Sequence, residues 1–134
     1  MLLTVVGGLP AVGKTAVCRE VLRLRAESQA GPATWLRIDT IEQALRDSGE
    51  ILPGMPAGAG YYVAAAVARD VLASGGDVLV ECVNPLPITR RLWEETASDL
   101  GARFLAVELI CSDEAEHRRR AQQRVSDIKG LELP

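Results

Sequence analysis

The chain has 134 residues, of which 48% are hydrophobic and 25% are charged, and its formal net charge is −3. This composition indicates one ordinary globular domain, and its slightly acidic balance argues against a surface built for a nucleic-acid duplex. No apolar run reaches the length of a membrane span, and Met1 to Val6 lacks the basic start of a signal peptide.

The cysteines indicate a reducing environment. Cys18, Cys82 and Cys111 are odd in number, scattered, and without the spacing of a metal site. Such residues usually behave as small, buried apolar side chains in cytoplasmic proteins. We therefore predict a cytoplasmic protein.

The chain begins with a strand, a glycine-bearing loop and a helix. Leu2 to Val6 is an apolar run of strand type, and a helix is expected from about Lys14 to Glu27. Between them, residues 8–15 read Gly-Leu-Pro-Ala-Val-Gly-Lys-Thr and fit the phosphate-binding pattern G-x-x-x-x-G-K-[ST]. A strand before this pattern and a helix after it are the setting that the motif requires.

The loop predicts a site for a nucleoside triphosphate and Mg²⁺. Backbone N–H groups at the start of a helix have no intrahelical partner, and with the helix dipole they attract phosphate. Lys14 would reach the outer phosphates, and the Thr15 hydroxyl would serve Mg²⁺. The expected nucleotide-contacting residues are Gly8, Pro10, Ala11, Val12, Gly13, Lys14, Thr15 and Ala16.

The second predicted strand, Thr34 to Ile38, is closed by Asp39, and a short helix from Thr40 to Asp47 follows. A carboxylate at this position could orient or deprotonate an acceptor hydroxyl. Asp39 and Glu42 also have the spacing of a helix cap and its partner. Both interpretations stay open, since a cap uses only one carboxylate oxygen.

A long Gly/Pro-rich loop, residues 49–60, precedes a helix predicted from Tyr61 to Ala73. Irregular loops of this length are usually functional. Tyr61 and Tyr62 could line an acceptor pocket or pack into the core, and packing is slightly favoured.

The third predicted strand runs from Asp77 to Val83 and carries Glu81 near its end. An acid at this place holds Mg²⁺ through water in phosphate-loop enzymes, although aspartate is the usual residue. The alternative is a locally hydrogen-bonded acid. A helix is expected from about Ile88 to Leu100, and the sequence does not decide whether its two arginines, Arg90 and Arg91, face the acceptor or solvent.

The last predicted elements are a strand from Arg103 to Ile110 and an arginine-bearing helix near residues 113–126. Arg120 and Arg124 are four residues apart and share a face, so they could clamp a transferring phosphoryl group. The alternative is a solvated basic face. His117, on the same helix, is interpreted as a surface residue.

Strands that alternate with helices predict an α/β fold, with a mostly parallel sheet covered on both faces. Such sheets bind ligands at the carboxyl ends of their strands. We therefore expect one three-layer α/β/α domain over residues 1–134.

Five stretches together carry a resemblance to a known family. They are Gly8 to Thr15, Arg37 to Glu42, Gly60-Tyr61, Cys82 to Pro85 with Thr89-Arg90, and Cys111 to Asp113 with His117-Arg118. The chain resembles small bacterial proteins called AAA family ATPases of the P-loop kinase type. Their wider clan includes adenylylsulfate kinase, gluconate kinase, chloramphenicol phosphotransferase, polynucleotide kinase and zeta toxins.

The resemblance implies that Asp39 is the catalytic base or acceptor-orienting group and that the arginine helix is a lid over ATP. We expect the strand order 2-3-1-4. Two departures stand out: Glu81 replaces the usual aspartate, and relatives continue into a fifth strand, a base-contacting loop and a final helix. We therefore expect the chain to lack that segment, which leaves the choice between ATP and GTP open.

The sequence thus predicts an ATP-dependent phosphotransferase acting on a hydroxyl of a small molecule. Lys14, Asp39, Arg120 and Arg124 would be catalytic, while Thr15 and Glu81 would hold Mg²⁺. The alternative is a nucleotide-dependent switch or regulatory module without phosphotransfer. A polynucleotide 5′-hydroxyl is a second possible acceptor, against which the acidic balance argues. A guanine-specifying Asn-Lys-x-Asp is absent from the sequence, which argues against a GTPase.

Overall fold

The computed structural model describes residues 1–55, 58–83, 87–110, 113, 115–116 and 118–119. The strands are β1 (Leu2–Gly8), β2 (Thr34–Arg37), β3 (Val78–Glu81) and β4 (Arg103–Leu109). The helices are α1 (Lys14–Ala26), α2 (Ile38–Asp47), α3 (Ala59–Ala73) and α4 (Pro87–Leu100). Among these helices, none combines the length and the apolar character that a membrane span needs.

The four strands form one parallel sheet in the order β2-β3-β1-β4, which confirms the predicted fold class and strand order. The register places Arg37 on β2 and Val6 on β1 opposite Glu81 on β3. β2 and β3 therefore end level with each other, and β1 continues past them to Gly8, so three neighbouring strands end close together at the carboxyl edge of the sheet, where ligands of such folds bind.

The central strands β1 and β3 are buried on both faces, because alternate side chains enter two separate cores. Leu3 and Val5 of β1 join the larger core with residues of α3 and α4. Val6 points the other way and packs with Cys18 of α1 and Leu79 of β3. Continuous apolar runs are what a strand covered on both faces requires.

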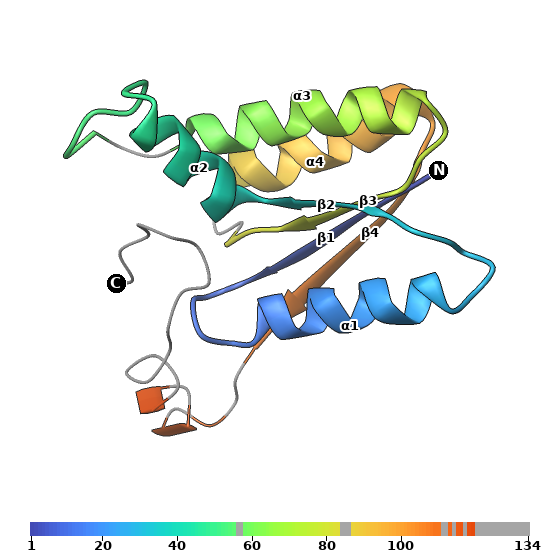
Figure 1. Ribbon diagram of the computed structural model, residues 1–134, viewed down its shortest axis with the longest axis horizontal. Coiled ribbons are helices and arrows are strands. Elements are labelled where there is room, and N and C mark those ends of the chain that lie inside the picture. The colour runs from blue at the N-terminus through green and yellow to red at the C-terminus, as the bar shows by residue number, and fades with distance from the viewer. Residues whose placement is uncertain (56–57, 84–86, 111–112, 114, 117, 120–134) are drawn as a thin grey trace.

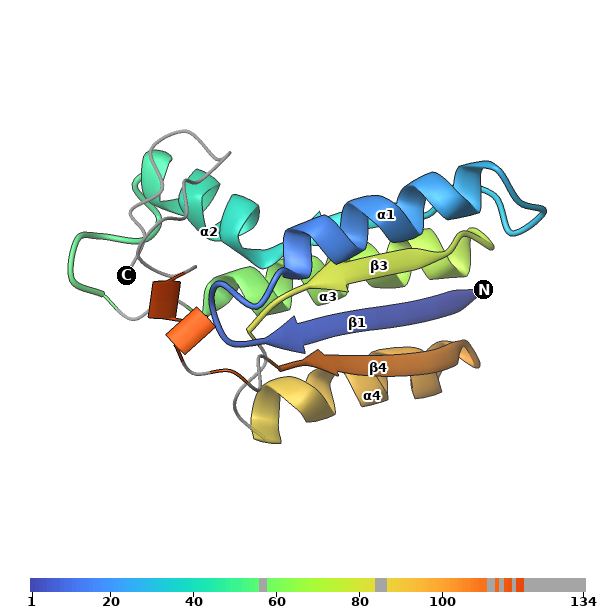
Figure 2. The same cartoon turned by 90° about the horizontal axis from the view of Figure 1, so that it is seen from below.

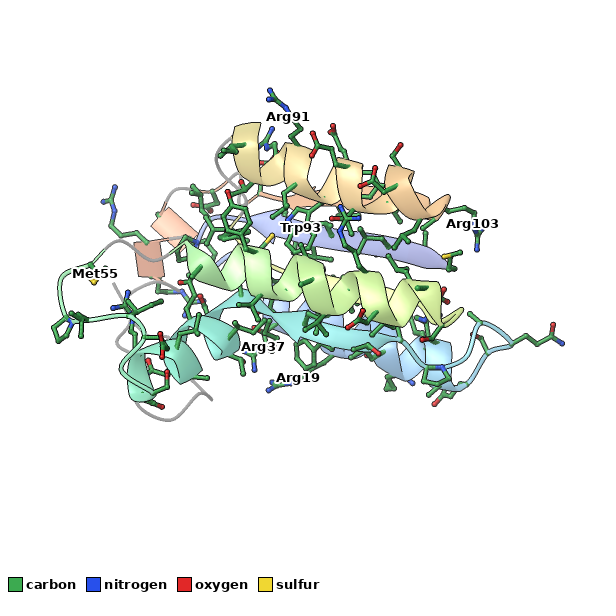
Figure 3. All side chains as sticks on the ribbon, turned by 90° about the horizontal axis from the view of Figure 1, so that it is seen from above. Arg19, Arg37, Met55, Arg91, Trp93 and Arg103 are labelled. Carbon is green, nitrogen blue, oxygen red and sulfur yellow. The ribbon has the colours of Figure 1, made fainter. Side chains whose placement is uncertain are left out.

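Helices cover both faces of the sheet, as the sequence predicts. In Figure 1, α1 crosses one face alone, while α2, α3 and α4 lie on the other. Seen from below in Figure 2, α1 runs along the sheet in front of the strands. Trp93 of α4 lies between α3 and α4 and is fully buried (Figure 3), so it anchors the larger core.

Some predicted boundaries differ from the observed ones. Helix α2 begins at Ile38, immediately after β2, whereas the sequence places Ile38 at the end of a strand. An apolar residue at such a junction suits either element, and here Ile38 enters the core from the first turn of a helix. The third strand is also shorter than predicted, and β1 runs on to Gly8.

Strands β2 and β4 are the two edges of the sheet formed by the described residues. β4 pairs with β1 on one side, and Leu105 in its middle is 50% exposed. An edge strand of this kind is less covered than a central one.

Candidate functional site

The loop between β1 and α1 has a left-handed backbone at three positions. Gly8, Ala11 and Gly13 have φ values of 147°, 66° and 96°. Gly8 is also crowded, since a Cβ there would lie 2.6 Å from the carbonyl oxygen of Leu109. The two glycines thus meet a backbone requirement, as the motif predicts, while Ala11 adopts a conformation that L-residues rarely take.

The loop leads into the N-terminus of α1, which lacks a side-chain cap at its N-cap residue, Gly13. Backbone N–H groups of a first helical turn have no partner within the helix, so this end favours an anion. Lys14 folds back over the loop, and its Nζ donates hydrogen bonds to the carbonyl oxygens of Gly8 at 2.7 Å and Leu9 at 3.0 Å. The loop therefore gathers a cation and a helix N-terminus at one place.

Thr15 and Glu81 meet behind the loop although they are 66 positions apart. The Thr15 hydroxyl donates a hydrogen bond of 2.7 Å to Glu81 Oε2. The other carboxylate oxygen, Oε1, is buried and accepts no hydrogen bond from the described residues. A carboxylate in this position still has a lone pair to offer to a donor or a cation.

Arg37 completes this cluster, although the sequence pattern does not indicate it as a site residue. Its Nε lies 3.8 Å from Glu81 Oε1, and its Nη2 donates a long hydrogen bond of 3.5 Å to Thr15 Oγ1. The guanidinium also lies 4.9 Å from the ring centroid of Trp35. The signal for Arg37 was its place at the end of the second strand, beside the strand that ends in Glu81.

The Thr15 and Glu81 oxygens suit Mg²⁺, which prefers oxygen ligands and keeps several waters and phosphate oxygens in its shell. Glu81 Oε1 is the buried oxygen that such a shell would satisfy. In the described part of the chain, no three His, Cys, Asp or Glu side chains gather as a metal cage. A shared site of protein, water and phosphate oxygens is therefore compatible with these residues, and an all-protein cage is not.

The described cysteines are buried, free thiols, as the sequence predicts. Burial, followed by the charge of Glu81, raises the pKa of the Cys18 thiol to about 12. Burial also raises the pKa of Cys82 to about 12. Both side chains therefore stay neutral at physiological pH and behave as core residues.

A cavity of about 380 Å³ opens at the same edge of the sheet. It is lined by Ile38, Asp39, Glu42, Gly58, Tyr61, Tyr62, Val83, Ile88, Thr89 and Leu92. Val83 connects the cavity to the phosphate loop, because its carbonyl oxygen accepts a hydrogen bond of 3.4 Å from the Gly8 amide. The volume lies within the range of small-molecule sites.

Asp39 lies in the first turn of α2, where it lines the cavity. The capping interpretation is wrong, because the N-cap is Arg37 and no side chain caps this helix. The helix starts one residue before Asp39, so its carboxylate is already inside the element that it was expected to precede. Asp39 and Glu42 instead share a helix face and line the same cavity.

The tyrosines and arginines left open by the sequence take distinct positions. Tyr61 both packs, with its ring centroid 6.3 Å from that of Trp93, and lines the cavity. Tyr62 lines the cavity and is 62% exposed. Arg90 Nη2 lies 3.6 Å from Glu108 Oε2, and Arg90 borders a second cavity of about 250 Å³ beside β4. Arg91 is exposed and points outward (Figure 3).

A family model described as an AAA domain matches residues 3–130, almost the whole chain. The chain belongs to this AAA domain family. The match confirms the resemblance to P-loop kinase-type proteins. No curated protein matches the chain.

Solved structures with the fold of this AAA domain include several kinases. The APS kinase CysC of Mycobacterium tuberculosis, in complex with AMPPNP and APS, matches with a TM-score of 0.72 and 24% identity over 90% of this chain and 68% of its own. Kti12 of Chaetomium thermophilum, in complex with ADP-AlF3, matches with a TM-score of 0.67 and 21% identity. The match covers 97% of this chain and 73% of the Kti12 chain.

A gluconokinase of Sinorhizobium meliloti matches with a TM-score of 0.57 and 22% identity, over 90% of this AAA domain and 63% of the gluconokinase. The chain thus spans less than two thirds of that enzyme's length. At these identities the three structures establish the fold alone.

Several predicted features of the AAA domain lie outside the described residues. They include Arg120, Arg124, His117, and most of the lid helix near residues 113–126. The site that the described residues build consists of the phosphate loop, the Thr15–Glu81–Arg37 cluster and the cavity beside Asp39. Glu42 is the second residue of this site that sequence reasoning missed, and its signal was the spacing of three residues from Asp39.

Proposed function

We propose that this AAA domain is an ATP-dependent phosphotransferase that transfers the γ-phosphoryl group to a hydroxyl of a small molecule. The observation that supports this most is the position of the cavity. It lies at the same strand edge as the phosphate loop, and Val83 borders it while accepting a hydrogen bond from Gly8. A donor site and an acceptor site in contact are the arrangement that phosphoryl transfer needs.

The loop would bind the triphosphate through its backbone. Backbone N–H groups of residues 9 and 11–16, around the N-terminus of α1, would surround the β- and γ-phosphates, whereas Pro10 has no N–H and the Gly8 N–H donates to Val83. On nucleotide binding, Lys14 Nζ would donate its hydrogen bonds to phosphate oxygens in place of the Gly8 and Leu9 carbonyl oxygens, because a charged acceptor gives the stronger hydrogen bond. This exchange leaves the Gly8 and Leu9 carbonyls facing solvent or nucleotide.

Thr15 and Glu81 would hold Mg²⁺. When bound, the ion would neutralise charge on the phosphates. Arg37 would balance the Glu81 carboxylate from the opposite side, and it keeps this buried acid compensated in the nucleotide-free protein.

Asp39 would hold and activate the acceptor. Its carboxylate would accept a hydrogen bond from the acceptor hydroxyl, whose oxygen attacks the γ-phosphorus. A new O–P bond forms, the bond between the γ-phosphorus and the bridging oxygen breaks, and ADP leaves with that electron pair. The hydroxyl proton passes to Asp39. The roles predicted for Arg120 and Arg124, neutralising the transferring group from a lid, complete the proposal.

The test is ADP formation by the intact chain with ATP and Mg²⁺, alone and with a panel of metabolites that carry hydroxyl groups. Stimulation by an alcohol, with a phosphate ester as product, is the expected result. Lys14→Ala should reduce turnover to the uncatalysed level. Arg23→Ala is the matched control, because it removes an exposed cation from the same helix.

Two outcomes would overturn the proposal. Full activity of Lys14→Ala would remove the phosphate loop from the mechanism. ATP hydrolysis that responds to a protein partner but to no alcohol would favour a nucleotide-dependent switch instead.

A further inference from the structure

The lining of the proposed acceptor cavity is negatively charged. Among the described residues that line it, Asp39 and Glu42 are charged, and both are acidic. The remaining lining residues are apolar, aromatic, glycine or threonine. A cavity walled in this way repels anions and favours a cation.

The two acidic residues differ in solvent exposure. They are three residues apart on one face of α2, so their Cβ atoms are about 5–6 Å apart. Asp39 is exposed, while Glu42 is partly buried. Gly60 at the start of α3 leaves room for the Glu42 side chain, because a Cβ at Gly60 would lie 2.5 Å from Glu42 Cγ. Any larger residue there would push the carboxylate out of position.

The surroundings of Glu42 leave its charge incompletely balanced. Burial first, and then the charge of Asp39, raise its pKa, while Arg46 on the next turn lowers it. Arg46 is exposed and does not line the cavity. From α3 and α4, the groups that face the cavity are the uncharged Tyr61, Tyr62 and Thr89 with apolar neighbours. A cation inside the cavity would therefore stabilise the ionised carboxylate.

The rest of the wall favours a hydrocarbon frame. Ile38 belongs to the larger core, and Leu92 and Tyr61 pack against it. All three side chains line the cavity and form its apolar wall. Burial of apolar area against such a wall supplies affinity, while the few polar groups fix orientation.

From this lining we infer that the acceptor is an amino alcohol with an apolar frame, whose ammonium group pairs with Glu42 and whose hydroxyl lies at Asp39. The inference rests on the proposed phosphotransferase function and specifies its substrate class. Asp39 would take the hydroxyl proton as described above, and Glu42 would act as a specificity-determining residue without a part in the bond changes.

The experiment compares three alcohols that differ at one group. Phenylalaninol carries an ammonium, N-acetylphenylalaninol is neutral, and 2-benzyl-3-hydroxypropanoate carries a carboxylate at the same carbon. The same series built on leucinol tests a smaller frame. The readouts are ADP and phosphate-ester formation with ATP and Mg²⁺, and calorimetric binding in the presence of AMPPNP.

The expected order of kcat/KM is cationic, then neutral, then anionic, with about a ten- to hundredfold advantage of the cationic over the neutral alcohol, since charge-assisted hydrogen bonds have this strength. Glu42→Gln should remove the advantage of the cationic over the neutral alcohol, and Glu42→Asp should keep part of it. Glu50→Gln, at an exposed glutamate just after α2, is the control and should behave as the parent protein. Thermal melting verifies that each variant is folded.

The outcomes separate the two proposals. A preference for neutral or anionic alcohols, or a cation preference that survives Glu42→Gln, overturns the substrate class and leaves phosphotransfer standing. ATP binding without ester formation from any of these alcohols overturns the substrate class alone when another alcohol of the metabolite panel is phosphorylated. When no alcohol of the panel is phosphorylated either, phosphotransfer itself fails.

Discussion

Arg37 and Glu81 end neighbouring parallel strands and face each other across them, with 3.8 Å between Arg37 Nε and Glu81 Oε1. Their side chains are only 16% and 8% exposed. Each ion is therefore largely removed from water and depends on the other for compensation. Because Thr15 contacts both side chains, this pair connects the phosphate loop to the interior of the sheet.

Replacing Arg37 by methionine should destabilise the nucleotide-free protein. The change leaves the Glu81 carboxylate buried without its cation, which costs about 1–3 kcal/mol of the free energy of unfolding for a pair that is not fully buried. Urea denaturation measures this loss. The double variant Arg37→Met/Glu81→Gln should recover part of it, because no uncompensated charge remains.

The exposed Arg23 is the control, and Arg23→Met should change the free energy of unfolding by at most about 1 kcal/mol. Equal losses in Arg37→Met and Arg23→Met would contradict the compensating role.

Replacing Glu81 by glutamine should raise the Mg²⁺ requirement of ATP turnover. Glutamine keeps the shape but loses the charge, and loss of such a supporting ligand typically weakens metal affinity by about ten- to a hundredfold. A Mg²⁺ titration at saturating ATP measures the change. Glu95→Gln, at an exposed position on α4, should leave the titration unaltered. An unchanged Mg²⁺ midpoint in Glu81→Gln would assign this acid a purely structural role.

Alanine substitutions at Gly8 and Gly13 should differ in severity. Both residues have left-handed φ, so alanine at either costs about 1–2 kcal/mol in backbone strain. At Gly8 the new Cβ would also lie 2.6 Å from the Leu109 carbonyl and 2.9 Å from Val12 Cγ2, while nothing lies within 4 Å of a Cβ at Gly13. Gly8→Ala should therefore lower the melting temperature more and weaken nucleotide binding more. Calorimetry and thermal melting of the pair test this, and equal effects would argue against the crowding at Gly8.

The pH dependence of stability should contain a contribution from Glu42. Its pKa in the folded protein is raised above the ordinary value of 4.5, chiefly by burial. The folded state therefore binds the proton more tightly than the unfolded chain, and stability falls as pH rises from about 4.5 through the raised pKa. Glu42→Gln removes this term, so the stability of the variant relative to the parent should increase over that interval. Urea denaturation between pH 4 and pH 7 measures it, with Glu50→Gln as the control. A relative stability that stays flat or decreases with pH would be inconsistent with the raised pKa.

Much of the fold follows from local pattern. The alternation of apolar strands with helices is sufficient to predict a parallel sheet with helices on both faces, because only that arrangement buries strands such as β1 and β3 on two sides. The phosphate loop is also predictable from local sequence. Its backbone takes positive φ angles at Gly8 and Gly13, which favour glycine, and both residues lie in one short segment.

Boundaries were less predictable. The sequence pattern places Ile38 at the end of a strand and leaves Asp39 open to a capping role, yet both residues belong to α2. Burial of Ile38 from the first helical turn is a tertiary effect that the local pattern does not contain.

By itself, the sequence determined the class of fold and the loop whose backbone suits a polyphosphate, because each depends on periodicity or on residues next to one another in the chain, and the strand order followed from its resemblance to a family. Only the tertiary structure brought Arg37 to the Thr15–Glu81 pair and placed Asp39 and Glu42 of α2 in one cavity with Tyr61 of α3 and Thr89 of α4. Those relationships depend on the register between β2 and β3 and on how α3 packs against α2. They are contacts between distant segments, and no local run of residues encodes them.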